Sequence, residues 1–542
     1  MRLRQSIFTL CIFAPILLSW GCGNSGGDSK KTTSPPPPTP GTVDVLTYHN
    51  DNARTGQNLS ETTLTTSNVA SATFGKLGFY TTNAKVDAEP LVATAVSVPG
   101  KGTLDLLVVA AENDNVYAFD ADNPGTQIWS TSMLKSGETT SDDRSCDQVS
   151  PQIGVTATPV IDRSRGPNGV VYVVAMSKNG STYHQRLHAL DLALGTELFG
   201  GPADVQATYP GTGDNSSGGN VIFDPGQYKE RAGLLMLNGS LYTSWASHCD
   251  IRPYTGWIMA YDPSTLAQTA VLNVTPNGNE GAIWASGAGL AADSSGNIYF
   301  LDANGFFDTN LTNGFPSQGD YGNAFIKLST SGKLAVADYF EMYNQASENG
   351  SDVDLGSGGA MVLPDLTSGG QTMHLAVGAG KDGNLYVVNR DSMGKFNASN
   401  NSSVYQELSG SFSSIFSAPA YFNNTVYFGP VGSSIKAFTI SNAKLSSSPA
   451  AQSANSFGFP GASPSISANG TNNAILWAIE NSSPAVLHAY DATNLSELYN
   501  SNQASGGRDQ FGAGNKFMTP MIANGKVYVG TPTGVAVFGL LQ

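Results

Sequence analysis

Short apolar runs, each followed by a tight turn, recur through most of the 542 residues. A small residue or proline begins an apolar strand, a turn follows, and a second strand carries an aromatic residue before a third strand begins. The spacing is roughly 45 to 75 residues, as expected for a repeated supersecondary unit. The openings of the units are Glu89-Pro90, Thr158-Pro159, Ala232-Gly233, Ala288-Gly289, Gly359-Ala360, Ala418-Pro419, Ser463-Pro464 and Thr519-Pro520.

The second strands of these units combine β-branched and aromatic residues. They include Val171-Tyr172-Val173, Leu241-Tyr242, Ile298-Tyr299-Phe300, Val426-Tyr427-Phe428, Leu476-Trp477 and Val527-Tyr528-Val529. Several follow glycine-bearing turns of the hairpin type, such as Asn238-Gly239, Ser295-Gly296 and Asn524-Gly525. The pattern predicts an all-β fold, an eight-bladed β-propeller of four-stranded antiparallel blades. A pair of β-sandwich domains is the alternative.

The two ends of the repeat region complement each other. The last unit, residues 518–541, has room for only three strands before the chain stops, whereas residues 72–82 form an unpartnered strand ahead of the first unit. We expect this N-terminal strand to complete the last blade, because a closed ring leaves no open sheet edge.

Composition supports a turn-rich β protein. Apolar residues make up 40% of the chain, which is enough for a large core, while charged residues make up only 13% and glycine is abundant, at 61 residues. The formal net charge of −15 makes the surface a poor electrostatic partner for nucleic acid. We expect a monomer that binds no nucleic acid.

The N-terminus has the features of an export signal. Arg2 and Arg4 precede an apolar run from Ile7 to Trp20 that is too short to span a bilayer. We predict a signal peptide over residues 1–21 and a Pro/Gly/Ser-rich tether over residues 22–43. The tether includes the run Pro35-Pro36-Pro37-Pro38 and cannot bury a core. Residues 44–542 then form a single propeller domain, with repeats from about residue 72.

Cys22 directly follows the apolar run and resembles the acylated cysteine of bacterial lipoproteins. The resemblance implies a lipid anchor and, with Gly23 in place of aspartate, the outer membrane, on its periplasmic side or at the cell surface. Ser19 and Trp20 depart from the usual leucine and small residue of that signal. Ordinary secretion is therefore the alternative.

The remaining exported cysteines, Cys146 and Cys249, are expected to pair. The repeat assigns each connection to one of the two rims of the propeller. Most turns between the first and second strands of a unit are short, whereas the long insertions fall on the opposite rim. Long loops of this kind are where function concentrates. Both cysteines map to that rim, in neighbouring blades. The insertions are residues 146–154, 177–185, 247–256, 276–286, 302–322 and 344–358.

This loop-rich rim holds the candidate ligand-binding residues. His248 and Asp250 lie beside Cys249 and could act as a base with its partner or as metal ligands; a loop held by the disulfide is the alternative. Asp352 and Asp354 precede the inner strand of the fifth unit, where Ca²⁺ or a hydroxylated ligand would meet them. Asp302, Asn304, Asp308 and Asp320 add oxygens in a neighbouring loop, although turn formation explains them equally well.

The third strands carry a recurring motif: Ala118-Phe119-Asp120, Ala189-Leu190-Asp191, Ala260-Tyr261-Asp262 and Ala489-Tyr490-Asp491. Together with the residues that follow, this motif resembles the repeat of quinoprotein-type propellers, Ala-x-Asp-x-x-Thr-Gly-x-x-x-Trp, in which the Trp docks one blade on the next. Trp129, Phe199 and Tyr499 lie at or near the docking position. The resemblance covers residues 72–541 and supports the fold more strongly than any chemistry.

In quinoprotein dehydrogenases a tryptophan lies under the pyrroloquinoline quinone, an acidic cluster binds calcium and a disulfide between adjacent cysteines covers the cofactor. The resemblance implies Trp284, Asp354 and Lys381 for the remaining roles, with Asp354 as the candidate metal ligand. Lys381-Asp382-Gly383 also makes an ordinary hairpin turn. The chain departs from the family because it has no adjacent cysteines and no Cys-x-x-Cys-His haem motif.

The sequence supports two functional hypotheses. The first is a binding or interaction module for a polymer or partner protein, reached through the loops of blades one to five. The second is a calcium- and pyrroloquinoline-quinone-dependent alcohol or sugar dehydrogenase with a separate electron acceptor. A funnel plugged by Phe306, Phe307 or Tyr321 would argue against the second.

Overall fold

The computed structural model describes residues 42–542. The expected signal peptide, Cys22 and the tether up to residue 41 lie outside the described residues, so the domain boundaries predicted there stay predictions. No helix within residues 42–542 has the length and apolar character needed to cross a bilayer. The prediction of an all-β fold is confirmed, because β-sheets form almost all of the regular structure.

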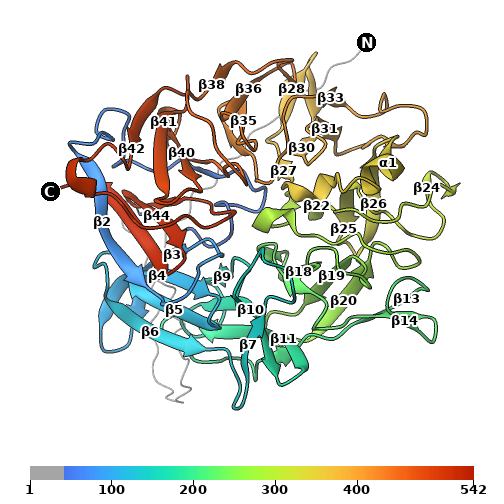
Figure 1. The fold of residues 1–542 in the computed structure, drawn as a ribbon, viewed down its shortest axis with the longest axis horizontal. Coiled ribbons are helices and arrows are strands. Elements are labelled where there is room, and N and C mark those ends of the chain that lie inside the picture. Colours follow the sequence, from blue (N-terminus) through green and yellow to red (C-terminus); the bar gives the residue numbers. More distant parts are fainter. Residues whose placement is uncertain (1–41) are drawn as a thin grey trace, which may run out of the picture. The chain divides into compact units, whose positions relative to one another are not determined.

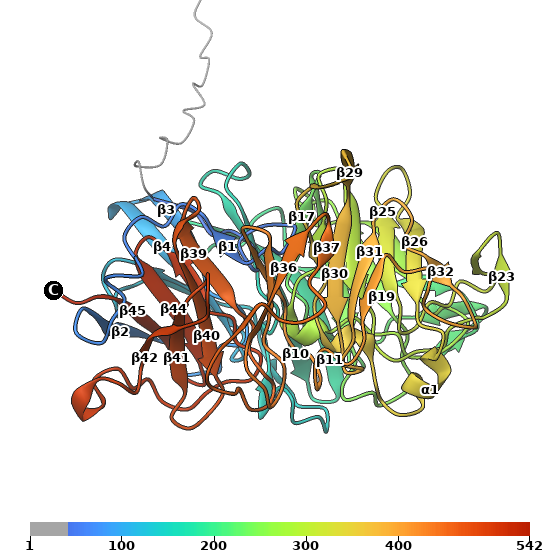
Figure 2. The same ribbon diagram turned by 90° about the horizontal axis from the view of Figure 1, so that it is seen from above.

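The strands of residues 42–542 form eleven sheets, and eight of these have four or more strands. Figure 1 shows the larger sheets following one another around a common axis, and Figure 2 shows them edge-on. Within each larger sheet, successive strands of the chain pair mostly antiparallel. The repeated strand-and-turn pattern therefore corresponds to one sheet per unit.

The first two larger sheets contain β3 (Leu91–Val98), β4 (Gly102–Ala111), β5 (Asn115–Asp120) and β6 (Gln127–Ser132), then β7 (Thr139–Asp142), β8 (Gln152–Ile153), β9 (Val160–Asp162), β10 (Val170–Asn179), β11 (Thr182–Asp191) and β12 (Ala203–Asp204). The next two contain β16 (Lys229–Glu230), β17 (Leu235–Leu237), β18 (Ser240–Ala246), β19 (Trp257–Tyr261) and β20 (Gln268–Asn273), then β21 (Ala291–Ala292), β22 (Asn297–Leu301), β25 (Phe325–Ser329), β26 (Ala335–Glu341) and β32 (Lys395–Phe396).

The fifth and sixth contain β27 (Met361–Val362), β30 (Leu375–Ala379), β31 (Leu385–Asn389) and β33 (Gln406–Leu408), then β34 (Ala420–Phe422), β35 (Thr425–Phe428), β36 (Lys436–Ser441), β37 (Lys444–Leu445) and β38 (Ala451–Gln452). The last two contain β1 (Gln57–Asn58), β39 (Ser465–Asn469), β40 (Asn472–Glu480), β41 (Val486–Asp491) and β42 (Glu497–Asn500), then β2 (Phe74–Thr81), β43 (Met521–Ala523), β44 (Lys526–Thr531) and β45 (Gly534–Leu540).

Smaller elements lie in the connections. They are β13 (Thr208–Pro210), β14 (Ser216–Ser217), β15 (Asn220–Ile222), β23 (Leu311–Thr312), β24 (Phe315–Pro316), β28 (Leu366–Ser368), β29 (Gln371–Met373), the helix α1 (Gln345–Asn349) and three single-turn 3-10 helices at Ala285–Gly287, Leu355–Ser357 and Ser505–Gly507.

The sheets pack face to face through apolar side chains. In β10, every residue from Val170 to Ser177 is buried, because neighbouring sheets cover both faces of the strand. Trp129 on β6 joins the first sheet to the second: its Nε1 donates to the carbonyl of Leu192 at 3.0 Å. Gly195 has a φ of 68°, and a Cβ there would lie 2.5 Å from the Trp129 ring, so glycine is required at this junction. This is the docking role expected for Trp129.

The N-terminal strand pairs with the end of the chain as expected. β2 runs antiparallel to β45, with Phe74 opposite Leu540 and Thr81 opposite Gly534. The sheet order β2-β45-β44-β43 places β2 on the outer edge. Pairing between residues more than 450 positions apart joins the two ends of the described chain in one sheet.

The sequence analysis did not anticipate the role of residues 43–58, the axial segment. This segment hydrogen-bonds to one strand of each of the eight larger sheets, namely β3, β9, β17, β21, β27, β34, β39 and β43. The residues that it contacts are Val92, Ile161, Met236, Ala292, Val362, Tyr421, Ile466 and Ile522. A short segment thus ties all eight units together through backbone groups that would otherwise be buried without partners.

Arg54 lies at the centre of the axial segment and is fully buried. Its guanidinium donates to the carbonyl oxygens of Tyr48 at 2.8 Å, Leu290 at 2.9 Å and Leu234 at 3.3 Å, and to the hydroxyl of Thr47 at 2.8 Å. Burial lowers its pKa to about 10, so the group stays charged at neutral pH. The cation therefore joins two neighbouring sheets to the segment.

Replacing this guanidinium should destabilise the fold. We expect Arg54→Met to lower the free energy of unfolding by about 3 kcal/mol or more, because several buried carbonyls lose a charged donor. Urea unfolding followed by tryptophan fluorescence measures the change. Arg252→Met is the control, since the Arg252 side chain is 50% exposed and pairs with Asp214. Equal stability of the two variants would show that Arg54 does not hold the axis.

Candidate functional site

The predicted disulfide between Cys146 and Cys249 is confirmed. Cys146 lies in the connection between β7 and β8, and Cys249 lies in the loop between β18 and β19. The two Cα atoms are 5.5 Å apart. The bond therefore joins loops of two neighbouring sheets, although 103 residues separate the cysteines in the chain.

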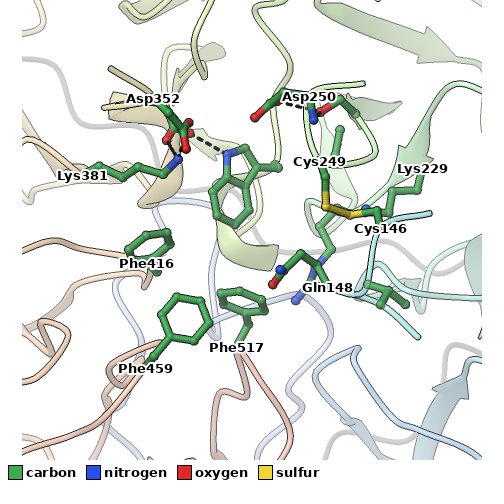
Figure 3. Close-up of a pocket in the computed structure, with 16 residues that line it drawn as sticks. Cys146, Gln148, Lys229, Cys249, Asp250, Asp352, Lys381, Phe416, Phe459 and Phe517 are labelled. Carbon is green, nitrogen blue, oxygen red and sulfur yellow. Dashed lines mark hydrogen bonds and ion pairs between the residues drawn. A yellow bond between two sulfur atoms is a disulfide. The ribbon is translucent and has the colours of Figure 1, made fainter. Parts of the chain in front are cut away.

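A pocket of about 280 Å³ opens beside this disulfide. Figure 3 shows Lys381 and Asp352 on one side, Lys229 and the cystine on the other, and the rings of Phe416, Phe459 and Phe517 in the lower part of the view. Of the predicted site residues, the pocket lining includes Asp250, Trp284, Asp352, Asp354 and Lys381. The fold thus brings together five residues that the sequence spreads over more than 130 positions.

Trp284, Asp354 and Lys381 form one connected group. The Trp284 indole Nε1 donates to Asp354 Oδ2 at 2.8 Å, and the Lys381 ammonium lies 2.6 Å from Asp354 Oδ1. Lys381 also donates to Asp352 Oδ1 at 2.7 Å. Burial raises the pKa of Asp354, while the facing Lys381 charge opposes this rise. The pKa of Lys381 is raised despite its burial, because Asp354 and Asp352 stabilise the ammonium.

Three phenylalanines that the sequence analysis missed form the aromatic wall of the pocket. The ring centroids of Phe416 and Phe517 each lie 6.0 Å from that of Trp284, and Phe459 lies 5.3 Å from Phe416. The rings meet at tilted or edge-on angles, which aromatic pairs favour. Their connections come from different sheets, so no local pattern in the sequence indicated that they would meet.

Lys229 and Arg231 form the opposite wall and were also missed. Lys229 is 5% exposed and Arg231 is 4% exposed, and both line the pocket. Among residues 42–542, neither side chain has a hydrogen-bond or ion-pair partner, although the Arg231 guanidinium lies 5.5 Å from the Phe517 ring centroid. The run of three charged residues, Lys229-Glu230-Arg231, is unusual in a chain with few charged residues and could have marked this site in the sequence.

The electrostatics of the two walls differ. Lys381 is neutralised by Asp352 and Asp354, whereas Lys229 and Arg231 have no carboxylate in contact. Burial, and next the Arg231 charge, lower the pKa of Lys229 to about 8. The wall with Lys229 and Arg231 can therefore accept an anion without breaking an existing ion pair.

His248 and Asp250 do not form the hydrogen-bonded pair expected of a general base and its partner. Asp250 Oδ1 accepts hydrogen bonds from Ser247 Oγ at 3.0 Å and from Tyr254 Oη at 2.7 Å. His248 is buried, neither ring nitrogen has a hydrogen-bond partner within the described chain, and it does not line the pocket. Burial and the nearby Lys229 lower the pKa of His248 to about 2, so it stays neutral.

The acidic residues predicted for calcium do not gather into a metal-type cluster in the described part of the chain. Residues 42–542 contain no group of three or more His, Cys, Asp or Glu side chains placed to hold a metal. Both oxygens of Asp354 already face Trp284 and Lys381. Asp302 and Asn304 are buried near this group, and Asn304 Nδ2 donates to Asp352 Oδ1 at 2.8 Å. Asp308 accepts from Ser317 of its own loop, and Asp320 accepts from the backbone N–H of Asn277 in the neighbouring connection.

The aromatic residues suggested as a plug do not line the pocket. Phe307 and Tyr321 pack against Tyr339 in the core, with ring centroids 5.8 and 5.3 Å away, and Phe306 is 47% exposed. The pocket is thus open to a ligand on this rim, bordered by the cystine, the aromatic wall and six charged groups, three of each sign.

Sheets repeated about one axis, with a pocket among the loops of one rim, define a β-propeller. Similar solved structures include the quinohemoprotein alcohol dehydrogenase from Comamonas testosteroni, with a TM-score of 0.58 and 14% identity over 92% of this chain and 80% of that chain. A europium-containing methanol dehydrogenase has a TM-score of 0.60 and 13% identity, over 92% of this chain and 98% of that chain.

A quinohemoprotein alcohol dehydrogenase from Pseudomonas putida HK5 is similar to the same degree, with a TM-score of 0.58 and 12% identity over 92% of this chain and 80% of that chain. No family model matches the chain, and no curated protein matches it. The resemblance to quinoprotein-type propellers is confirmed for the fold. At such low identity it assigns no chemistry to the pocket.

The buried ammonium of Lys229 should make stability depend on pH. Its pKa is about 8 in the folded protein against 10.5 ordinarily, so folding disfavours the charged form. The wild-type free energy of unfolding should rise by about 3 kcal/mol as pH increases between these two values, and Lys229→Met should remove this rise. Lys229→Met should therefore exceed the wild type in free energy of unfolding by the largest margin below about pH 8.

Urea unfolding at about pH 7 and about pH 10 tests this expectation, with each variant compared with the wild type at the same pH. Lys101→Met is the matched control, because Lys101 is exposed. If the difference in free energy of unfolding between Lys229→Met and the wild type is the same at both pH values, Lys229 is not a buried, unpaired ammonium.

Proposed function

We propose that this protein is an exported, lipid-anchored, eight-bladed β-propeller that acts as a binding module. Its ligand is a polymer or partner protein that reaches the loop-rich rim and places an acidic group in the pocket. The protein functions as a monomer in the cell envelope, held at the outer membrane through Cys22. The leader, the proline-rich tether and the loop asymmetry support this assignment.

The single observation that carries the proposal is the pair of buried cations without acceptors. Lys229 and Arg231 line the pocket, are almost wholly buried and have no anionic partner in the described chain. Leaving a buried charge unpaired is costly, and a carboxylate or phosphate group of a ligand would satisfy it. Arg231 also presents a planar fork suited to two-point recognition of a carboxylate.

The adjoining Trp284, Phe416 and Phe517 rings favour a ligand group with an apolar or aromatic face next to its charge. Asp352 and Asp354 do not oppose the anion strongly, because Lys381 pairs with both. The pocket therefore combines an aromatic surface with a wall on which Lys229 and Arg231 have no ion-pair partner in the described chain. The carboxylates of Asp250, Glu112 and Asp87 nevertheless lie near enough to oppose the fall in the pKa of Lys229 that burial causes.

Binding of benzoate to the full-length protein, followed by calorimetry and tryptophan fluorescence, tests the proposal. We expect benzoate to bind at least tenfold more tightly than benzamide, because only benzoate pairs with the cations. Arg231→Gln should reduce benzoate affinity about tenfold or more, whereas Arg508→Gln should leave it unchanged, since Arg508 bonds to Asp509 on the outer side of the last sheets.

Equal affinity for benzoate and benzamide, or an unchanged affinity in Arg231→Gln, would contradict the proposal. If benzoate binds as expected, acidic and neutral oligosaccharides tested in the same assay identify the polymer class, and a protein partner is indicated if neither competes with benzoate.

A quinone-dependent dehydrogenase is the second candidate, favoured by the bonded group of Trp284, Asp354 and Lys381. The absence of a calcium-type cluster from residues 42–542 speaks against it. Dye-linked oxidation of alcohols and sugars, after adding pyrroloquinoline quinone with and without Ca²⁺, separates the two functions. Turnover that saturates with one quinone per chain and is lost in Lys381→Met would replace the binding-module proposal.

A further inference from the structure

Lys229 and Arg231 are placed to act on one small group together. Lys229 and Glu230 form β16, which pairs with β18 through Lys229 opposite Ala246 and Glu230 opposite Trp245. Because side chains alternate along extended backbone, Lys229 and Arg231 lie on one side and Glu230 on the other. Both Lys229 and Arg231 consequently line the pocket, two residues apart.

The two cations differ in what they can do. Arg231 offers a planar guanidinium that can hold an anion but cannot act as a nucleophile. The Lys229 amine has a pKa of about 8, so roughly a quarter of it is neutral near pH 7.5, against about a thousandth for an ordinary lysine. A neutral amine is a nucleophile, because its lone pair is free to attack an electrophilic carbon.

Asp250 supplies a carboxylate on the same side of the pocket. Its Oδ1 accepts from Ser247 and Tyr254, whereas Oδ2 has no hydrogen-bond partner within residues 42–542. Figure 3 shows Asp250 and Lys229 on the same side of the pocket as Cys249, with Phe416, Phe459 and Phe517 across from them. A nucleophile, an anion-binding group, a proton carrier and an aromatic wall therefore meet in one cavity.

We propose that the pocket takes an aromatic or unsaturated oxo acid, which Arg231 holds by its carboxylate while Lys229 forms an imine with its carbonyl carbon. The inference rests on the proposed function, since it names the acidic group that the module binds. It assigns to Lys229 a covalent role that an ordinary structural lysine cannot have.

The reaction needs no oxidant or reductant. The lone pair of Nζ attacks the carbonyl carbon, a C–N bond forms, and the carbonyl π pair moves to oxygen, which takes a proton as nitrogen releases one. A second proton, taken up from solvent through Asp250, protonates the hydroxyl group, which leaves as water while the nitrogen lone pair forms the C=N bond of a protonated imine. Asp250 carries the proton between nitrogen and oxygen. Addition of water reverses the sequence and releases the ligand.

Reductive trapping on the full-length protein tests this inference, with 4-carboxybenzaldehyde as the probe and cyanoborohydride as the reductant. Peptide mapping by mass spectrometry reports labelling at each lysine. We expect Lys229 to be labelled at least tenfold faster than exposed Lys101, with half-maximal rate near the pKa of about 8. Benzaldehyde, which lacks the carboxylate, should label Lys229 about tenfold more slowly than the acid probe.

Two variants sharpen the test. Lys229→Met should lose the fast adduct, and Arg231→Gln should slow labelling by 4-carboxybenzaldehyde without changing labelling by benzaldehyde. Circular dichroism verifies that each variant is folded, and the Lys101 labelling rate verifies equal exposure to the reagents. The wild-type comparison of Lys229 with Lys101 needs no variant, so poor folding of either variant leaves the test intact.

Equal labelling of Lys229 and Lys101, or fast labelling that persists in Lys229→Met, would overturn the imine. The outcome is separate from that of the proposed function. If benzoate binds and depends on Arg231 but Lys229 is not trapped, the imine is wrong and the binding module stands. If Lys229 is trapped equally by both aldehydes and benzoate does not bind, the acidic-ligand proposal is wrong.

Discussion

The hydrogen bonds between the axial segment and one strand of every larger sheet are the constraint on which the rest of the structure depends. The contacted strands, β3, β9, β17, β21, β27, β34, β39 and β43, are two to eight residues long, and their edges face the axis, where bulk water cannot satisfy them. Residues 43–58 supply those partners, and Arg54 adds a cation that binds carbonyls of neighbouring sheets. Gly56, with a φ of 65°, leaves room for the His49 ring, which lies 2.2 Å from where its Cβ would be.

A fixed axis lets the loops on the rim differ without loss of the fold. The Cys146–Cys249 bond joins two of those loops, and the connections before β21 and β27 bring Trp284 and Asp354 together from neighbouring sheets. The resulting pocket has one wall of paired charges and one of unpaired cations. The two unpaired cations are thus confined to a small concave region of an acidic chain, where they can select an acidic group.

The contrast with quinoprotein dehydrogenases lies in the site and not in the fold. The resemblance implied a disulfide of adjacent cysteines over the cofactor and an acidic calcium cluster. This chain instead places a disulfide between two loops at the side of its pocket, and Lys381 lies between the two carboxylates that precede the fifth inner strand. An ammonium in that position pairs with both carboxylates, which a divalent cation would otherwise need as ligands.

The sequence alone determined the all-β class, the order of the units, the pairing of Phe74–Thr81 with the last strand, and the partner of Cys146. These features depend on the alternation of apolar and polar residues, on turn residues and on the even number of exported cysteines. All three can be recognised in the sequence without knowledge of long-range contacts. The tertiary structure decided the rest. Residues 43–58 have no strand-like pattern, because their hydrogen bonds go to eight different sheets. Likewise, Lys229 and Arg231 became site residues only when loops from distant units enclosed them, since burial and the lack of a partner are properties of the assembled pocket.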